Sequence, residues 1–298
     1  MPVPDNRIVN TLRYASEYLG IGRWIAPFPI RREARTWKHD RFPAQSGEVV
    51  KPPDFVGVGT QKSGTSWWAS LIEQHPAVVP NKYNRKEMHY LAHFLSKPMT
   101  DEDIRTYHSV FARPEGKICG EWTPNYMAQP QALVRLKQAA PDAKLLILLR
   151  NPVDRYESGF NHERKQRFGG IIGPSIRLEV IKQYALQAES IWNGMYASQL
   201  EIVSDLFPTE QVLTLQYVQC CSDPKHCLEK TYRFLGLDHD FQPQELRKSV
   251  NPQKRVTKKL SDELREVLKT IYRPQVRQLV QRYPNEIDLS LWSDFNDE

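Results

Sequence analysis

The sequence predicts an α/β fold, a single P-loop-type domain in which a central parallel sheet is flanked by helices. Two apolar segments, residues 55–58 and 144–149, have the composition of buried parallel strands, and a polar turn and a helical pattern follow each. From residue 54 onward, strand and helix patterns alternate without a linker, a repeat or a low-complexity tract. The 298 residues are enough for one large domain with a buried core.

The first strand runs into a loop with the features of a phosphate-binding site. Gly64 allows a tight turn into the next helix, and the cation of the loop is Lys62. Hydroxyl groups stand beside the first unpaired N–H groups of that helix, on Ser63, Thr65 and Ser66. A helix start of this kind binds phosphate through its free donors and the positive end of its dipole.

The loop departs from the nucleoside-triphosphate loop at the residue that matters most. In that loop a lysine follows the second glycine and reaches the terminal phosphates, and the next hydroxyl holds Mg²⁺. Here Thr65 follows Gly64, and Lys62 lies inside the turn. The second strand ends in Arg150, where a triphosphatase would carry its magnesium aspartate. Both departures favour a phosphate site that needs no metal ion.

The second strand leads into another anion site. Asn151 is a natural N-cap, and Pro152 occupies the first helical position, which proline tolerates well. Ser158 lies seven residues after Asn151 and so returns to the same helix face. Arg150 and Ser158 can therefore bind one anion together, the guanidinium through paired donors and the hydroxyl through one.

Taken together and in this order, the two motifs resemble those of sulfotransferases that use 3′-phosphoadenosine 5′-phosphosulfate (PAPS). The run from Lys62 to Ser66 is similar to their 5′-phosphosulfate loop, and Arg150 with Ser158 is similar to their 3′-phosphate motif. The resemblance extends over about residues 54–292 and is closest in style to the heparan sulfate N- and 3-O-sulfotransferases. It implies PAPS as the donor, release of PAP (3′,5′-adenosine bisphosphate) and no metal. It also implies a basic loop over the 3′-phosphate, where Lys254 and Arg255 stand.

The same resemblance supplies candidate catalytic residues. Glu87 and His89 match the Glu-x-His-aromatic element of the glycosaminoglycan enzymes, in which the glutamate is the general base. Glu87 is the preferred base, His89 is the alternative, and Lys62 would neutralise charge on the leaving oxygen. Trp122 stands where several carbohydrate enzymes carry a lysine, so it would be either an acceptor platform or a core residue.

The predicted reaction is transfer of the sulfuryl group to a hydroxyl or amine of a carbohydrate, a glycolipid or a small molecule. Two other functions remain as alternatives, a metal-dependent nucleoside-triphosphate kinase and a non-catalytic nucleotide-binding module. Neither accounts as well for the pairing of Arg150 with Ser158. The sequence does not indicate which acceptor is used, nor the oligomeric state.

The remaining features are compatible with this interpretation. Residues 1–50 contain a basic, aromatic-rich stretch and are predicted to be an N-terminal extension, with the sulfotransferase domain at 51–298. The net charge of +6 suits an anionic donor, and the motifs of nucleic-acid-binding modules are missing. No segment has the pattern of a membrane span or signal peptide, which favours a cytoplasmic, bacterial enzyme. Reduced cysteines are expected, with a Cys221–Cys227 bridge as the alternative.

Overall fold

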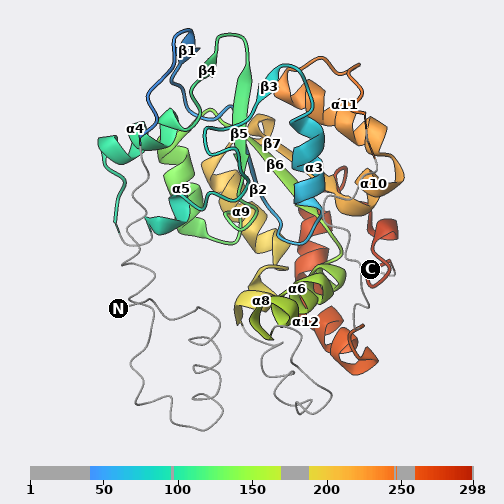
Figure 1. Cartoon of the computed structure of the whole chain (residues 1–298). Helices are drawn as coiled ribbons and strands as arrows, with labels where there is room; N and C mark the ends of the chain where they lie inside the picture. The colour runs from blue at the N-terminus through green and yellow to red at the C-terminus, as the bar shows by residue number, and fades with distance from the viewer. Residues whose placement is uncertain (1–40, 95–96, 169–187, 245, 247–258, 297–298) are drawn as a thin grey trace, which may run out of the picture.

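The computed structural model describes residues 41–94, 97–168, 188–244, 246 and 259–296 (Figure 1). Within them, five parallel strands form one sheet in the order β3-β5-β2-β6-β7, and β1 pairs with β4 in a separate antiparallel ribbon. The strands are β1 Glu48–Val49, β2 Phe55–Gly59, β3 Val78–Val79, β4 Arg113–Pro114, β5 Ile118–Trp122, β6 Lys144–Leu149 and β7 Val212–Gln216. The predicted fold class is confirmed.

Helices connect the strands and cover the sheet. The α-helices of the described part are α3 Thr65–Ile72, α4 Asp101–Ser109, α5 Pro130–Ala139, α6 Pro152–Phe168, α8 Ala188–Trp192, α9 Tyr196–Leu206, α10 Tyr217–Ser222, α11 Pro224–Leu235 and α12 Asp262–Arg282. Short 3₁₀ turns are η1 Leu91–His93, η2 Thr209–Gln211 and η3 Leu289–Leu291. None of the helices in this part of the chain is long and apolar enough to cross a membrane.

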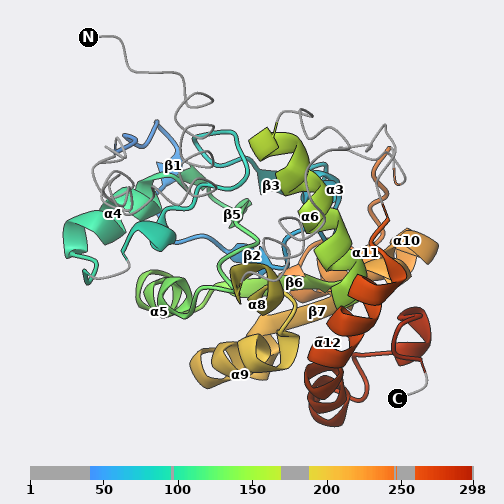
Figure 2. The ribbon, with the colours of Figure 1, turned by 90° about the horizontal axis from the view of Figure 1, so that it is seen from below.

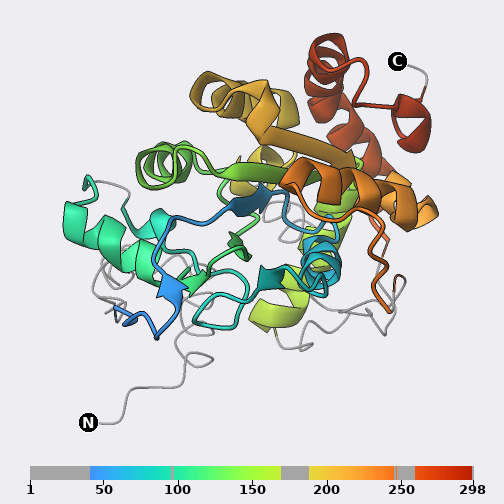
Figure 3. The same cartoon turned by 90° about the horizontal axis from the view of Figure 1, so that it is seen from above.

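The sheet separates two apolar cores, because successive residues of a strand point to opposite faces. On one face, Val56 and Leu145 pack among side chains of α4, α5, α9 and α12. On the other, Phe55 and Leu146 pack among side chains of α3 and α11. The two layers of helices are visible from below (Figure 2) and from above (Figure 3). Burial on both faces explains why these strands are continuous apolar runs in the sequence.

The two strands expected from the sequence are neighbours at the centre of the sheet. β2 and β6 pair in parallel, with Phe55 opposite Lys144. Their carboxyl ends therefore lie at the same edge, where β2 leads to α3 and β6 leads to α6. This edge of an open parallel sheet is the usual position of a ligand site.

The cysteines are reduced in this structure. Cys119, Cys220, Cys221 and Cys227 all carry free thiols, so the alternative Cys221–Cys227 bridge is not formed. Cys220 and Cys227 are both buried in the core beside α11, whereas Cys221 is exposed.

Candidate active site

The loop after β2 is shaped by backbone conformation and by hydrogen bonds to β6. Gly64 caps α3 in the left-handed conformation, with φ of 78°, and Lys62 is also left-handed, with φ of 70°. The Thr60 hydroxyl donates to the Leu148 carbonyl over 2.9 Å and lies 2.6 Å from the hydroxyl of Ser63. Ser63 is fully buried, and its hydroxyl bonds within the loop and helps to fix its shape.

The two anion motifs of the sequence lie against each other. Arg150 donates from its guanidinium to the Lys62 carbonyl over 3.3 Å. The Lys62 side chain runs along α6, since its Cγ lies 3.8 Å from where a Cβ on Gly159 would stand. Ser158, the preceding residue, is half-buried on the same helix. The structure thus brings Lys62, Arg150 and this turn of α6 together.

Two tyrosines hold Arg150 in place, and the sequence analysis identified neither of them. The Arg150 guanidinium lies over the ring of Tyr217 at 5.3 Å, and the Tyr196 hydroxyl donates to the Arg150 carbonyl over 2.9 Å. The Tyr217 ring also covers Gly64, where an added Cβ would lie 2.4 Å from it. Tyr217 therefore packs against both anion motifs at once.

The helix after Arg150 begins as the sequence predicts. The Asn151 side-chain oxygen accepts from the Val153 N–H over 3.0 Å, and Pro152 is the first residue of α6. Lys254 and Arg255, the predicted basic contacts, lie outside the described residues.

The predicted catalytic loop lies beside the phosphate loop and carries strained backbone. Asn84, Glu87 and His89 have φ of 48°, 62° and 55°, a region that residues other than glycine rarely occupy. The Glu87 N–H donates to the Trp122 carbonyl over 2.8 Å, which fixes the loop to the end of β5. Its carboxylate lies 3.8 Å from Nε2 of His89, so the two candidate bases are partners. Such strain is often found at functional sites.

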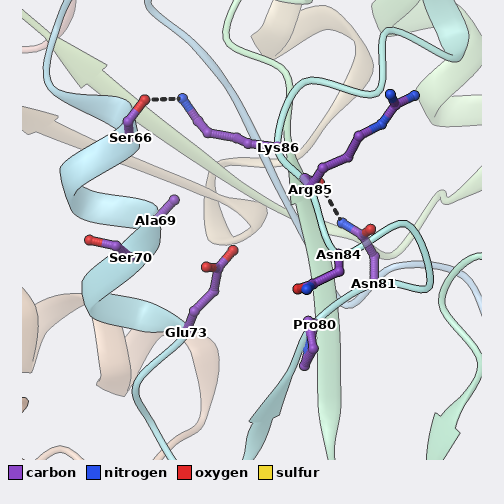
Figure 4. Close-up of a pocket in the computed structure, with 9 residues that line it drawn as sticks. All are labelled: Ser66, Ala69, Ser70, Glu73, Pro80, Asn81, Asn84, Arg85 and Lys86. Atoms are coloured by element: carbon purple, nitrogen blue, oxygen red, sulfur yellow. Dashed lines mark hydrogen bonds between the residues drawn. The ribbon is translucent and has the colours of Figure 1, made fainter. Parts of the chain in front are cut away.

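Lys86 joins the catalytic loop to the phosphate loop. Its Nζ donates to Thr65 Oγ1 and Ser66 Oγ, each over 3.0 Å, and lies 3.4 Å from Glu87 Oε1. Figure 4 shows the Lys86 side chain reaching across to Ser66 at the start of α3. Burial lowers the pKa of Lys86, and Glu87 opposes that shift. The sequence reasoning left Lys86 unassigned, although it directly precedes Glu87.

A polar pocket of about 280 Å³ opens beneath Lys86, between α3 and the loop after β3 (Figure 4). It is lined by Ser66, Ala69, Ser70, Glu73, Pro80, Asn81, Asn84, Arg85 and Lys86. Most of these residues carry a hydroxyl, amide or charged group, and Ala69 and Pro80 are the apolar ones. Ser66 belongs both to the pocket and to the phosphate loop, and Lys86 of the catalytic loop also lines the pocket and bonds to Ser66, so the pocket is continuous with the candidate site.

The end of β5 supports this loop from within the core. Trp122 is 2% exposed and faces Gly57, where a Cβ would lie 1.9 Å from its indole, so it is a core residue and no acceptor platform. Glu121 is 1% exposed and accepts from Tyr107 over 2.6 Å and from Thr123 over 2.7 Å. Burial raises the pKa of Glu121 to about 7, against the lowering effect of these hydrogen bonds.

Comparison with known proteins decides the family. Residues 52–278, more than half of the chain, match the family described as "Sulfotransferase domain". The chain belongs to this sulfotransferase family. The resemblance predicted from its motifs is confirmed, and PAPS, the donor that the resemblance implies, is the donor of the family.

Relatives of this sulfotransferase domain include enzymes named for heparan sulfate. It is 26% identical over 227 residues to a human bifunctional heparan sulfate N-deacetylase/N-sulfotransferase 3, covering 72% of this chain and 25% of that protein. It is 27% identical over 190 residues to a mouse heparan sulfate glucosamine 3-O-sulfotransferase 6, covering 62% and 52%. The alignments thus span only part of these relatives.

A solved bacterial structure is similar over its whole length. The sulfotransferase from Alicyclobacillus acidocaldarius superimposes with a TM-score of 0.61 at 26% identity, covering 82% of this chain and all of the other. Its agreement with the sheet and helices described above supports the same α/β architecture for both proteins.

Proposed function

We propose that this protein transfers the sulfuryl group of PAPS to a hydroxyl or amine of an acceptor and releases PAP. The observation that carries the proposal is the convergence of two anion motifs, around Lys62 and Arg150, beside a loop that presents Glu87. Sulfotransferase family membership supports the same reaction.

The residues fit a donor with phosphate at two positions. Lys62 and the N–H groups at the start of α3 bind the 5′-phosphosulfate, with Ser63, Gly64, Thr65 and Ser66 forming the cradle. Arg150 and Ser158 bind the 3′-phosphate, which distinguishes PAPS from ATP. The contact between Arg150 and the Lys62 carbonyl supports a single bound molecule that spans both motifs.

Glu87 acts as the general base, and His89 is its partner. As the acceptor oxygen or nitrogen attacks sulfur, its proton moves to the Glu87 carboxylate. The bond from sulfur to the bridging oxygen breaks, and its electrons go to the 5′-phosphate of PAP. Lys62 neutralises that oxygen, as preorganised charge does where charge develops in a transition state.

The pocket beside the site supports an acceptor with polar groups. Its hydroxyl and amide groups suit the hydroxyl-rich surface of a carbohydrate or glycolipid, or a small polar molecule. The relatives named for heparan sulfate favour a carbohydrate among these. A cytoplasmic location and the absence of a nucleic-acid partner stay predictions from the sequence.

Calorimetric titration with PAP, with AMP as the comparison ligand and EDTA present, tests the donor site. We expect PAP to bind at least about tenfold more tightly than AMP, because only PAP fills the Arg150 site. Equal affinities would overturn the proposal, and a requirement for Mg²⁺ together with preferential ATP binding would favour the kinase.

Turnover distinguishes the enzyme from a non-catalytic nucleotide-binding module. Mass spectrometric screening of hydroxyl and amine acceptors with PAPS should detect a product heavier by one sulfuryl group. Binding of PAP without consumption of PAPS by any acceptor in the screen would favour the binding module.

A further inference from the structure

Lys86 has the contacts of a functional residue rather than of a surface lysine. Its side chain is 19% exposed, and its ammonium has acceptors on two separate segments, the start of α3 and Glu87. A lysine ammonium carries three protons, and these three contacts account for all of them. The side chain is half-buried, and its ammonium is bonded on both segments, so its position is fixed.

The hydrogen bonds from Lys86 determine what the Thr65 and Ser66 hydroxyls can do. Each hydroxyl accepts one N–H from Lys86 over 3.0 Å, so its own proton must point away from Nζ. Both residues stand in the first turn of α3, at the helix end that attracts anions. A hydroxyl that accepts from a cation is also a stronger donor, because hydrogen bonds in a chain polarise one another.

We propose that Lys86 is a second cation, after Lys62, at the 5′-phosphosulfate end of the donor site, where it turns the Thr65 and Ser66 hydroxyls toward the phosphosulfate and holds Glu87 beside the same site. This inference rests on the proposed function. It adds a positioning residue to Lys62 and Arg150. It also explains how the phosphate loop and the catalytic loop keep a fixed separation.

The charges around Lys86 give the proposal a pH dependence. Burial lowers the pKa of Lys86. Glu87 on its own loop and Glu73, the residue that caps the C-terminus of α3, raise it, and Lys62 on the phosphate loop lowers it. With the net shift downward, the ammonium loses its proton at a lower pH than an ordinary lysine does. Donor affinity should therefore fall as the pH rises through the pKa of Lys86. Arginine at this position would stay charged over the same range.

The test is calorimetric titration of PAP, which needs no acceptor, from about pH 6 to pH 10, a range that includes the ordinary lysine pKa. We expect Lys86→Met to weaken PAP binding by roughly 10- to 100-fold at neutral pH, the usual range for a hydrogen bond from a charged group. Lys86→Arg should bind within about threefold of the wild type at neutral pH and lose its alkaline fall. All other titratable groups are the same in the three proteins, so the difference between wild type and Lys86→Arg isolates Lys86.

Lys117→Met is the matched control, because it removes the same charge from an exposed residue just before β5, at the edge of the sheet opposite the site. It should bind PAP like the wild type. The role of Lys86 would be overturned if Lys86→Met bound PAP as tightly as the wild type, or if PAP affinity fell equally at alkaline pH in wild type and Lys86→Arg. Neither result would affect the proposed function. A wild-type protein that does not bind PAP would overturn the proposed function as well.

Discussion

Arg150 is the residue that should distinguish PAP from AMP, through contact with the 3′-phosphate. Its guanidinium is held by the Tyr217 ring and by the Lys62 carbonyl, so it is already oriented before a ligand binds. We expect Arg150→Ala to weaken PAP binding by roughly 10- to 100-fold, because a charge-assisted bond to the 3′-phosphate is lost. AMP affinity should change far less, and calorimetry measures both.

Arg105→Ala is the control for this substitution, since Arg105 is exposed on α4 and pairs with Glu102, away from the donor loops. It should leave both affinities unchanged. If Arg150→Ala weakened the binding of AMP and of PAP by the same factor, Arg150 would not be a contact of the 3′-phosphate.

Replacing Glu87, the proposed general base, should lower turnover and leave the affinity for the donor unchanged. Its carboxylate is 45% exposed and is positioned by Lys86 and His89. We expect Glu87→Gln to lower the rate of PAP formation by roughly 100-fold or more, the usual contribution of a general base. His89→Asn should cost less, because His89 acts through Glu87.

The measurement is PAPS consumption with an acceptor found in the screen, together with PAP affinity by calorimetry. Glu115→Gln, in the exposed turn before β5, is the matched control. A larger loss for His89→Asn than for Glu87→Gln would make His89 the base.

At the scale of elements, the features best predicted from the sequence are those that depend on neighbouring residues. β2, β6 and the starts of α3 and α6 follow from apolar runs, glycine and proline, and all of them occur as predicted. What could not be predicted depends on side chains far apart in the sequence. Tyr217 covers Gly64 and Arg150 across the sheet, and Trp122 is buried because it packs under Gly57 of a neighbouring strand.

The turn from β2 into α3 depends on Gly64 for two reasons, and these can be separated. Gly64 has φ of 78°, and an added Cβ would also meet the Tyr217 ring. Gly116 has the same φ, but its Cβ would meet nothing within 4 Å. We expect Gly64→Ala to destabilise the protein more than Gly116→Ala, which should cost about 1 kcal/mol through backbone strain alone.

Urea unfolding measures both free energies, and PAP titration of the folded variants completes the comparison. Gly64→Ala should also lose PAP affinity, because the N-terminus of α3 and Arg150 both contact Tyr217. Equal destabilisation with unchanged PAP binding would mean that the Tyr217 ring moves aside freely.

At the scale of the whole molecule, the end of β5 connects the catalytic loop, which carries Glu87, to the core. The Trp122 carbonyl holds the Glu87 N–H, and the Tyr126 hydroxyl accepts from the Leu91 N–H over 3.2 Å. The buried carboxyl of Glu121 lies among Tyr107, Thr123 and Tyr126, so the same network joins α4 to the sheet. A charge that forms in this network affects the stability of the entire domain.

The stability of the protein should therefore depend on the ionisation of Glu121. Burial raises the pKa of Glu121 from the ordinary 4.5 to about 7 in the folded protein. A raised pKa means that the folded state holds the proton more tightly than the unfolded state does. Its stabilising contribution is complete below about pH 4.5 and is lost as the pH rises to about 7, by about 3 kcal/mol in total.

Glu121→Gln removes this titration while it keeps the shape of the side chain. We expect the free energy of unfolding in urea to fall less between about pH 4.5 and 7.5 in Glu121→Gln than in the wild type, with the difference approaching about 3 kcal/mol. Other carboxyl groups titrate in both proteins, so only the difference between the two curves reports on Glu121. Parallel curves would mean that Glu121 is ionised in the folded protein throughout this range, with its charge held by the hydroxyls of Tyr107 and Thr123.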